Sequence, residues 1–562
     1  MGLVLHVILL GCWIRAVGAC PEGCNCQTNQ LICSGISTFP KNIPSSTTTI
    51  YMSNCNFNSV KQDVSGELLE FIITSTPLTD LQPHTFDHAV NMTLFVITET
   101  QLQDLPDGLF QSNTKLTKLS LKQNKLTAIR SNWFKSLVNV TYLELSRNLI
   151  TSIAADAFHT MRSLEYLTLA GNNIAEIPSE TFKGLSKLTT LRLHRNSIKE
   201  IPPGCFEDLE NLKDLSLQDN SITHLHRDTF AKLPALEKLF LSNNLIASLP
   251  EGIFLNLPRL SQISLYENQL ESLAPGVFGP VLLKELWLYD NKISRLDDYT
   301  FRNLTHLSLL VISRNRIRHV SANAFQGLEK LGEVSLHTNL LTTLHDGTFQ
   351  GLPELVNISL EHNFINNLPN GFLQGVRHLG QIDLRNNSFE NLPQHTLDSF
   401  SIVDEILLHP NPWKCDTNIA DFRNWLQQNP SKTNQTLLVC DMPTNLEGEM
   451  IVFLTDENLM LSSTGQPKAT TTLKTGNTQT PSIRKSTSLP AVKTTTSKMV
   501  ELTSASGREE GEPATKNTSL ILIVIAVVTV VIVSIILVSC VSWRRNKTGR
   551  GDIGQRNKNS VL

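Results

Sequence analysis

The chain has 562 residues, of which 40% are hydrophobic and 18% charged, so it is long enough for several compact domains or for one long repeat array. Its formal net charge of −3 is unevenly distributed, because residues 544–562 carry six Lys or Arg against the single acid Asp552. Residues 1–543 therefore carry a net negative charge, and a protein of this kind is not expected to bind nucleic acid.

Residues 1–19 predict a secretory signal peptide. An apolar stretch is followed by the small residues Val17, Gly18 and Ala19, which suit cleavage after Ala19, although the usual basic start is missing. We therefore expect the chain from residue 20 onward to be exported.

Two cysteine clusters predict disulfide caps, because cysteines of exported chains pair in an oxidising environment. A zinc site is the alternative, but no histidine cluster lies beside them. The caps are expected over residues 20–46 and 412–461. The candidate disulfide cysteines are Cys20, Cys24, Cys26, Cys33, Cys415 and Cys440. Cys55 and Cys205 have no evident partner and are interpreted as small buried apolar residues.

A repeat covers residues 47–411 in about sixteen copies, and its asparagines recur every 24 residues, with one spacing of 23. Most copies follow the frame L-x-x-L-x-L-x-x-N-x-L, and Thr100, Thr76 and Cys55 replace the asparagine in three weaker copies. The frame asparagines are residues 124, 148, 172, 196, 220, 244, 268, 291, 315, 339, 363, 387 and 411.

The frame predicts a short strand followed by a turn. The x-L-x-L-x part places both leucines on one side of a strand, toward a core shared with the neighbouring copies. The asparagine amide can both donate to and accept from backbone groups that the turn leaves buried. A phenylalanine follows ten residues after the asparagine position in each of the twelve copies from Thr76 to Asn339. We interpret these twelve phenylalanines, from Phe86 to Phe349, as core residues.

One copy cannot bury its own apolar side, so the copies must stack and both ends need a cap. The predicted fold is therefore an α/β repeat, a leucine-rich repeat solenoid shaped like a horseshoe. Its parallel strands lie on the concave side, and irregular or short helical segments lie on the convex side.

Large apolar side chains occupy positions beside the strand leucines in four consecutive copies, where a solenoid presents side chains to solvent on its concave face. Such a group predicts a site for a protein ligand, since aromatic residues dominate binding hot spots. Stacking of neighbouring rings along the sheet is the alternative. The candidate ligand-binding residues are Phe240, Tyr266, Trp287, Tyr289, Leu309 and Val311.

A basic group on the same face predicts a second site, for an acidic or sulfated partner attracted by charge. Glu144, Asp214 and Asp219 lie among its members, so a solvated surface of mixed charge is the alternative. The basic residues are Lys118, Lys122, Arg147, Arg192, His194 and Arg195.

The C-terminal part predicts a membrane anchor. Residues 462–518 are rich in Ser and Thr and predict an extended stalk. Residues 519–543 contain an uncharged apolar run and predict a single transmembrane helix, with a buried soluble helix as the alternative. Basic residues in the tail 544–562 predict that this end lies in the cytoplasm. With the N-terminal part outside, the chain is expected to be a single-pass type I protein of the plasma membrane. The triplet Arg550-Gly551-Asp552 would then be cytoplasmic.

Seven N-x-S/T sequons would lie outside the cell and are expected to accept glycans. They are Asn91, Asn139, Asn303, Asn357, Asn386, Asn434 and Asn517. No metal-ligand spacing, nucleophile elbow or phosphate loop is present, so we expect no enzyme, no cofactor and no metal.

The repeat frame, the N-terminal cysteine cap, NPWKCD at 411–416 and FRNWL at 422–426 together resemble the extracellular leucine-rich repeat receptors. Many members have four cysteines in the second cap, where this chain has only Cys415 and Cys440.

The resemblance implies cell adhesion or migration and binding to matrix proteins of the collagen, fibronectin or laminin class. A lateral receptor organiser or co-receptor, which dimerises or binds other membrane proteins, is the alternative. The sequence leaves the oligomeric state open.

Overall fold

A computed structural model describes residues 20–463, apart from 62–63 and 65. The predicted signal peptide, transmembrane helix and cytoplasmic tail lie outside the described residues, as does nearly all of the stalk. Within the described part, no helix is long and apolar enough to cross a membrane.

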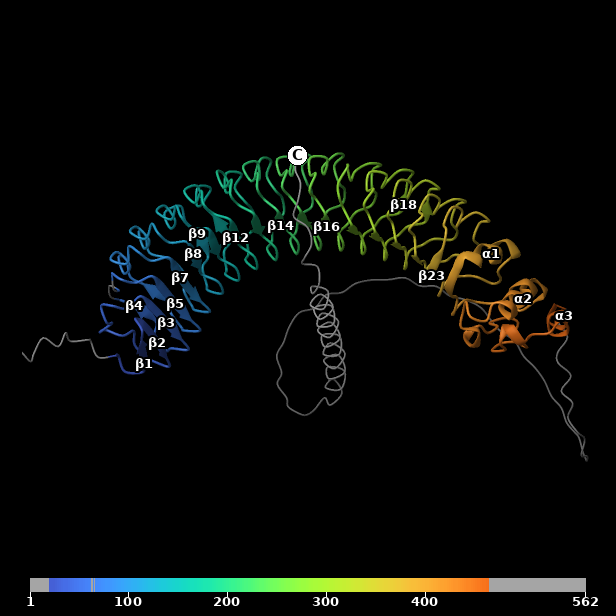
Figure 1. Ribbon diagram of the computed structural model, residues 1–562, viewed down its shortest axis with the longest axis horizontal. Helices are drawn as coiled ribbons and strands as arrows, with labels where there is room; N and C mark the ends of the chain where they lie inside the picture. Colours follow the sequence, from blue (N-terminus) through green and yellow to red (C-terminus); the bar gives the residue numbers. More distant parts are fainter. Residues whose placement is uncertain (1–19, 62–63, 65, 464–562) are drawn as a thin grey trace, which may run out of the picture. The chain divides into compact units, whose positions relative to one another are not determined.

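Stacked turns form the predicted solenoid, with strands along the inner side of an arc and turns along its outer side (Figure 1). Eighteen strands of the described chain form one sheet, in which successive turns pair in parallel. Only β1 runs antiparallel, against β2. The strands are β1 Cys24–Gln27, β2 Gln30–Ser34, β3 Thr49–Ser53, β5 Glu70–Thr74, β7 Leu94–Thr98, β8 Lys118–Ser120, β10 Tyr142–Glu144, β12 Tyr166–Thr168, β13 Thr190–Arg192, β14 Asp214–Ser216, β15 Lys238–Phe240, β16 Gln262–Ser264, β17 Glu285–Trp287, β19 Leu309–Val311, β21 Glu333–Ser335, β22 Asn357–Ser359, β23 Leu379–Asp383 and β24 Val403–Leu407.

Most of these strands are shorter than predicted. Strand β16 contains Ile263 at its centre, but Leu265, the second inward residue of the frame, follows its end. The backbone at Leu265 still bonds to the next turn, with N–H donating to the Trp287 carbonyl at 3.1 Å. The regular ladder ends early because the chain already curves inward toward the asparagine.

The frame asparagines bind the turns as the sequence predicted. Asn172 donates from Nδ2 to the carbonyls of Leu145 and Leu169, at 3.1 and 2.8 Å, and its Oδ1 accepts from the Ile150 N–H at 3.1 Å. The same pattern recurs along the array; at Asn315, for example, Nδ2 reaches the Leu288 carbonyl at 2.9 Å. Each amide therefore satisfies buried backbone groups of its own turn and of the preceding turn.

The phenylalanine column forms a buried spine behind the sheet. Neighbouring rings stack with centroids 5.8 to 6.4 Å apart over Phe230, Phe254, Phe278, Phe301, Phe325 and Phe349. Every ring of the column is at least 98% buried. The interpretation of these residues as core is confirmed.

The outer side consists mainly of turns, with three pairs of two-residue parallel strands. These are β4 Ser59–Val60 with β6 Asp80–Leu81, β9 Ala128–Ile129 with β11 Ser152–Ile153, and β18 Arg295–Leu296 with β20 His319–Val320. The α-helices of the described chain lie at the C-terminal end, as α1 Gln394–Ser399, α2 Ala420–Gln428 and α3 Asp456–Ser463.

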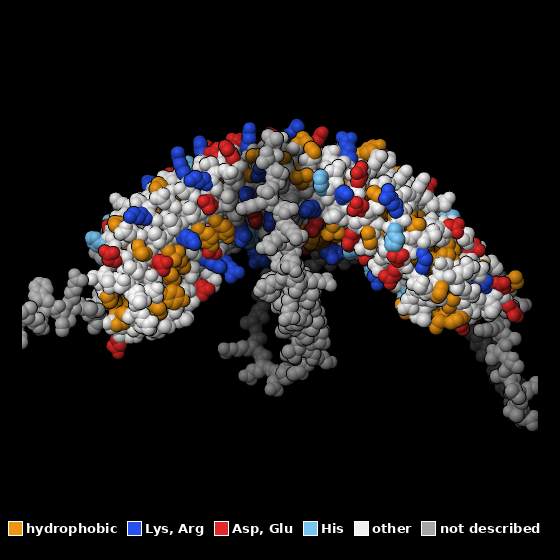
Figure 2. All heavy atoms as spheres, in the orientation of Figure 1, with side chains coloured by type: hydrophobic (Ala, Val, Ile, Leu, Met, Phe, Trp, Pro, Cys, Tyr) orange, Lys and Arg blue, Asp and Glu red, His pale blue; other side chains and the backbone are white. Residues whose placement is uncertain are grey.

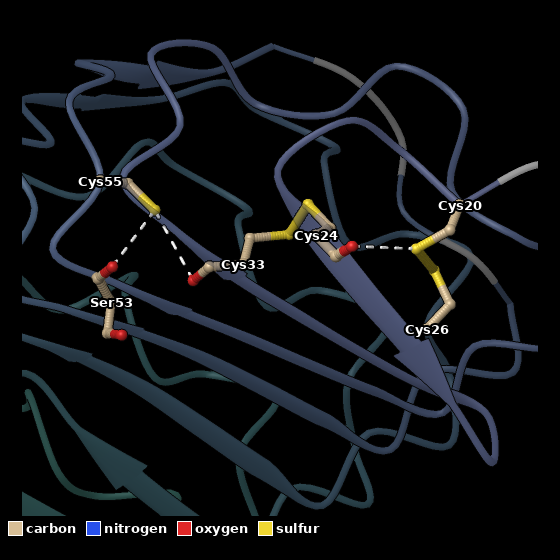
Figure 3. The surroundings of a disulfide bond; sticks show 6 residues. All are labelled: Cys20, Cys24, Cys26, Cys33, Ser53 and Cys55. Carbon is tan, nitrogen blue, oxygen red and sulfur yellow. Dashed lines mark hydrogen bonds between the residues drawn. A yellow bond between two sulfur atoms is a disulfide. The ribbon is translucent and has the colours of Figure 1, made fainter.

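Disulfides form at both ends of the solenoid. At the N-terminal end, Cys20 pairs with Cys26 and Cys24 pairs with Cys33 (Figure 3). At the other end, Cys415 pairs with Cys440, beside the fully buried ring of Trp413.

The two remaining described cysteines, Cys55 and Cys205, are free and buried. Burial raises the pKa of the Cys205 thiol to about 12. Both residues therefore act as small core side chains, as predicted.

Replacing a frame asparagine should destabilise the array. Asn172→Ala would leave the Ile150 N–H without its partner and would remove one of the two amide donors from each of the Leu145 and Leu169 carbonyls, so we expect the free energy of unfolding to fall by about 3 kcal/mol. Urea denaturation measures the loss. The neighbouring Asn173→Ala is the matched control, because Asn173 is exposed and should change stability by less than about 0.5 kcal/mol. Equal losses in both variants would contradict this role.

Candidate binding face

The inner face is a grid of solvent-facing positions aligned by strand register. The third residue of each strand faces that of the next, so Phe240, Ser264, Trp287 and Val311 form one row across β15, β16, β17 and β19. Leu309 belongs to the row of first strand residues, beside Glu285. Parallel pairing at one register therefore gathers side chains that are about 24 residues apart in the sequence.

The aromatic patch, defined as Phe240, Tyr266, Trp287, Tyr289, Leu309 and Val311, contains three rings in mutual contact. Tyr266 and Tyr289 stack with centroids 4.5 Å apart and planes 7° apart. Trp287 lies 6.5 Å from Tyr266 and 6.4 Å from Tyr289, tilted against both. Trp287 remains 36% exposed, and the other members are half-buried. The rings thus stack along the sheet and also keep a face toward solvent.

Arg314 belongs to this surface, although the sequence analysis did not single it out. Its guanidinium lies 5.1 Å from the centroid of Tyr289 and forms an ion pair with Asp290. Burial and the neighbouring Tyr266 and Glu267 raise the pKa of Tyr289, so this ring stays neutral at physiological pH. Arg314 could have been found by extending the frame, because it precedes the frame asparagine as Asp290 does in the turn before.

Of the six basic residues singled out in the sequence, five line one hollow on the inner face and the sixth does not. Lys122, Arg147, Arg192, His194 and Arg195 line a hollow of about 380 Å³, whereas Lys118 does not. Figure 2 shows Lys and Arg side chains along the inner rim of the N-terminal part of the arc. We call this hollow the basic pit.

Two of the basic side chains are partly neutralised. Lys122 lies 3.6 Å from Glu144, and Arg195 lies 3.4 Å from Asp219. Arg192 instead stacks over the ring of Tyr166, with its guanidinium carbon 5.5 Å from the centroid. The pit is therefore of mixed charge, because Glu144 lines it together with the basic side chains.

A stacked tyrosine pair borders the pit. The rings of Tyr142 and Tyr166 lie 4.6 Å apart and nearly parallel, at 5°. The Tyr142 hydroxyl donates to Glu144 Oε2 at 3.0 Å. Burial and the charge of Glu144 raise the pKa of Tyr142 well above its usual range. Both rings therefore stay neutral donors and apolar surfaces.

A second apolar row lies on the inner face and was missed at the sequence level. Strand register aligns Ile32, Tyr51, Ile72 and Val96 across β2, β3, β5 and β7. Ile32 and Tyr51 are 41% and 37% exposed. These turns belong to the cap or to copies that match the frame weakly. Their inner-face positions could be found only by extending the repeat register toward the N-terminus.

The structure describes six of the seven sequon asparagines. None of the six sequon asparagines within the described range is buried, and Asn357 faces the inner side on β22, while Asn517 lies outside the described residues. Among the described residues, no group of three His, Cys, Asp or Glu side chains is arranged to hold a metal ion.

Comparisons with known proteins identify the repeat. The leucine rich repeat family model matches residues 114–174, 167–220, 186–246, 234–282, 281–339 and 329–389. The Toll–Spatzle complex of Drosophila is similar at 19% identity, over 76% of this chain and 71% of that chain, with a TM-score of 0.54. The leucine-rich repeat domain of APL1 is similar at 21% identity, over 62% of this chain and 89% of that chain, with a TM-score of 0.50. These likenesses concern the fold.

Removing the carboxylate beside Tyr142 should lower the pKa of its phenol. Glu144→Gln eliminates the negative charge and the charged acceptor, while burial remains, so we expect the pKa of Tyr142 to fall but to stay above that of free tyrosine. Alkaline titration of the phenolate absorbance measures the shift. Glu333→Gln, an exposed residue of the same face, is the control. An unchanged titration in Glu144→Gln would rule out the contact.

Proposed function

Since the chain is a leucine-rich repeat protein over residues 114–389, we propose that it binds a protein ligand on the inner face of its solenoid through the aromatic patch. The proposed role is that of a receptor or adhesion protein, without catalysis of its own. We further propose that it is a single-pass type I protein of the plasma membrane with the solenoid outside, which the uncharged apolar run within residues 519–543 supports.

The stacked, partly exposed rings of Tyr266, Trp287 and Tyr289 carry this proposal. Exposed aromatic rings supply a large contact area, and rings held in place by their neighbours lose little conformational freedom on binding. Phe240 and Val311 extend the same row on either side through strand register. A surface of this composition fits a partner with an apolar or aromatic protrusion.

The surroundings of the patch limit the kind of partner. Glu267, Glu285 and Asp290 lie beside the rings, and Arg314 is already paired with Asp290. This charge pattern favours a protein partner that surrounds its apolar protrusion with basic and polar groups.

The disulfides support an extracellular position, since such bonds persist in oxidising compartments. The similar Toll structure is a complex with Spatzle, which supports a protein as the partner class. The repeat frame and caps support a closer resemblance to leucine-rich repeat-containing protein 15, with platelet glycoprotein V more distant. That resemblance favours collagen, fibronectin or laminin as ligands in adhesion or migration.

The test is binding of the purified full-length protein to immobilised collagen, fibronectin and laminin. Trp287→Ala with Tyr289→Ala should weaken binding at least roughly thirtyfold, because the loss of even one hot-spot aromatic costs about 2 kcal/mol and the two losses are not simply additive. Added salt should have little effect, since the contact is apolar. Phe364→Ala is the matched control, because this exposed aromatic residue of the same array lies outside the patch.

Full binding by the double variant, with unchanged thermal unfolding, would refute the aromatic patch as the site. Absence of binding by the wild type to all three proteins would refute the matrix ligands. Sedimentation of the same samples tests the alternative role, since self-association that the double variant abolishes would make the patch a dimer interface.

A further inference from the structure

The basic pit exists because one turn of the array carries only small side chains at its last three inner-face positions, after Tyr166. The turn of β12 presents Thr168, Ala170 and Gly171 at the positions where the next turn presents Arg192, His194 and Arg195. Arg147 of the preceding turn closes the other side. The hollow thus lies where the turn of β12 has small side chains, between two neighbouring turns that carry arginines. We call these two turns the walls of the pit.

Backbone geometry does not require the glycine at this position. Gly171 has a φ of +68°, but the equivalent residues of other turns adopt φ values of 56° at Arg147, 56° at Arg195 and 57° at Asp219. A side chain is therefore compatible with this conformation. Its absence at Gly171 leaves space beside the stem of Arg147, whose Cγ would lie 3.5 Å from an added Cβ.

The two walls carry positive charge that the protein does not neutralise. Neither Arg147 nor Arg192 forms an ion pair with a carboxylate in the described part of the chain, whereas Lys122 and Arg195 each have one. Arg192 stacks on Tyr166 by its face, which leaves the edge of its guanidinium free to donate hydrogen bonds. Arginine edges of this kind match the oxygens of a sulfate or phosphate ester.

His194, which also lines the pit, has an unpartnered ring nitrogen. Its Nδ1 is buried and has no hydrogen-bond partner among the described residues. Burial, together with Arg192 and Arg195, lowers the pKa of His194, against the weaker opposite effects of Asp219 and Asp214. The ring is therefore neutral at physiological pH, and an anion in the pit would favour its protonated form.

We propose that the basic pit binds a single sulfate ester, that of a sulfotyrosine in an extended segment of the protein ligand. Glu144 on β10 lines the pit beside Lys122, and Asp214 lies on β14 beyond the other wall, so the arginines leave room for one anionic group rather than for a sulfated polysaccharide. The stacked pair of Tyr142 and Tyr166 offers an apolar surface beside the anion for the phenyl ring of the ligand. The proposal rests on the proposed function, because the carrier is the protein ligand of the inner face.

The test is a titration of the purified full-length protein with a short sulfotyrosine peptide, beside the same peptide with unmodified tyrosine. We expect the sulfated peptide to bind at least roughly tenfold more tightly, since the guanidinium groups donate charge-assisted hydrogen bonds to the sulfate oxygens. Arg147→Ala, Arg192→Ala and Gly171→Asp should each remove most of this difference. Thr338→Asp is the matched control for Gly171→Asp, because Thr338 occupies the same frame position with a φ of 53° away from the pit.

Acidification gives an independent readout. The affinity for the sulfated peptide should rise as the pH falls from about 7.5 to about 5, because His194 becomes charged, and His194→Gln should abolish that rise. The variant Trp287→Ala with Tyr289→Ala should bind the sulfated peptide as the wild type does. A failure of the aromatic patch is thereby distinguished from a failure of the pit.

Three results would overturn the proposal. Equal binding of the sulfated and unsulfated peptides would show that the pit does not recognise the ester. Equal binding of the sulfated peptide by wild type and Gly171→Asp would place the site elsewhere. A heparin fragment that binds more tightly than the sulfated peptide and loses affinity in Gly171→Asp would make the pit a polysaccharide site.

Discussion

The hydrogen bonds of the frame asparagines are the constraint on which the rest of the structure depends. Each turn bends its backbone inward and buries carbonyl and N–H groups that water can no longer reach. The amide of Asn172 satisfies such groups in its own turn and in the preceding turn, so it joins two repeats while closing one. Near the N-terminal end, the Thr76 and Thr100 hydroxyls accept from the N–H groups of Cys55 and Leu102 instead.

Because inward aliphatic residues, the phenylalanine column and the frame asparagines provide most of the buried contacts, the solvent-facing strand positions are free to vary without loss of the fold. The structure uses that freedom differently in neighbouring turns. The turns of β16 and β17 present stacked rings, whereas the turn of β12 presents only small side chains after Tyr166 and leaves a hollow between arginines. The strands β13 to β15 join these two regions in one register, so an extended ligand could contact both.

Ring stacking and exposure are compatible on this surface. Tyr266 and Tyr289 lose part of their exposed area to each other, but this contact holds the rings in one orientation before a ligand arrives. The guanidinium groups of Arg192 and Arg314 likewise lie over the rings of Tyr166 and Tyr289 and hold them in place. In both cases a neighbouring turn supplies the partner, which explains why no short segment of sequence contains the whole arrangement.

The amino-acid sequence by itself determined the repeat, its inward leucines and asparagines, the phenylalanine spine and the cysteines of the caps, because each follows a period of about 24 residues that is visible without coordinates. It also determined that Trp287 and Tyr289 occupy solvent-facing positions. Only the tertiary structure decided that Tyr266 stacks on Tyr289, that Arg314 covers that ring, and that Gly171 opens a pit between Arg147 and Arg192. These contacts join different turns, and their distances depend on strand register and rotamers, which a one-dimensional period does not specify.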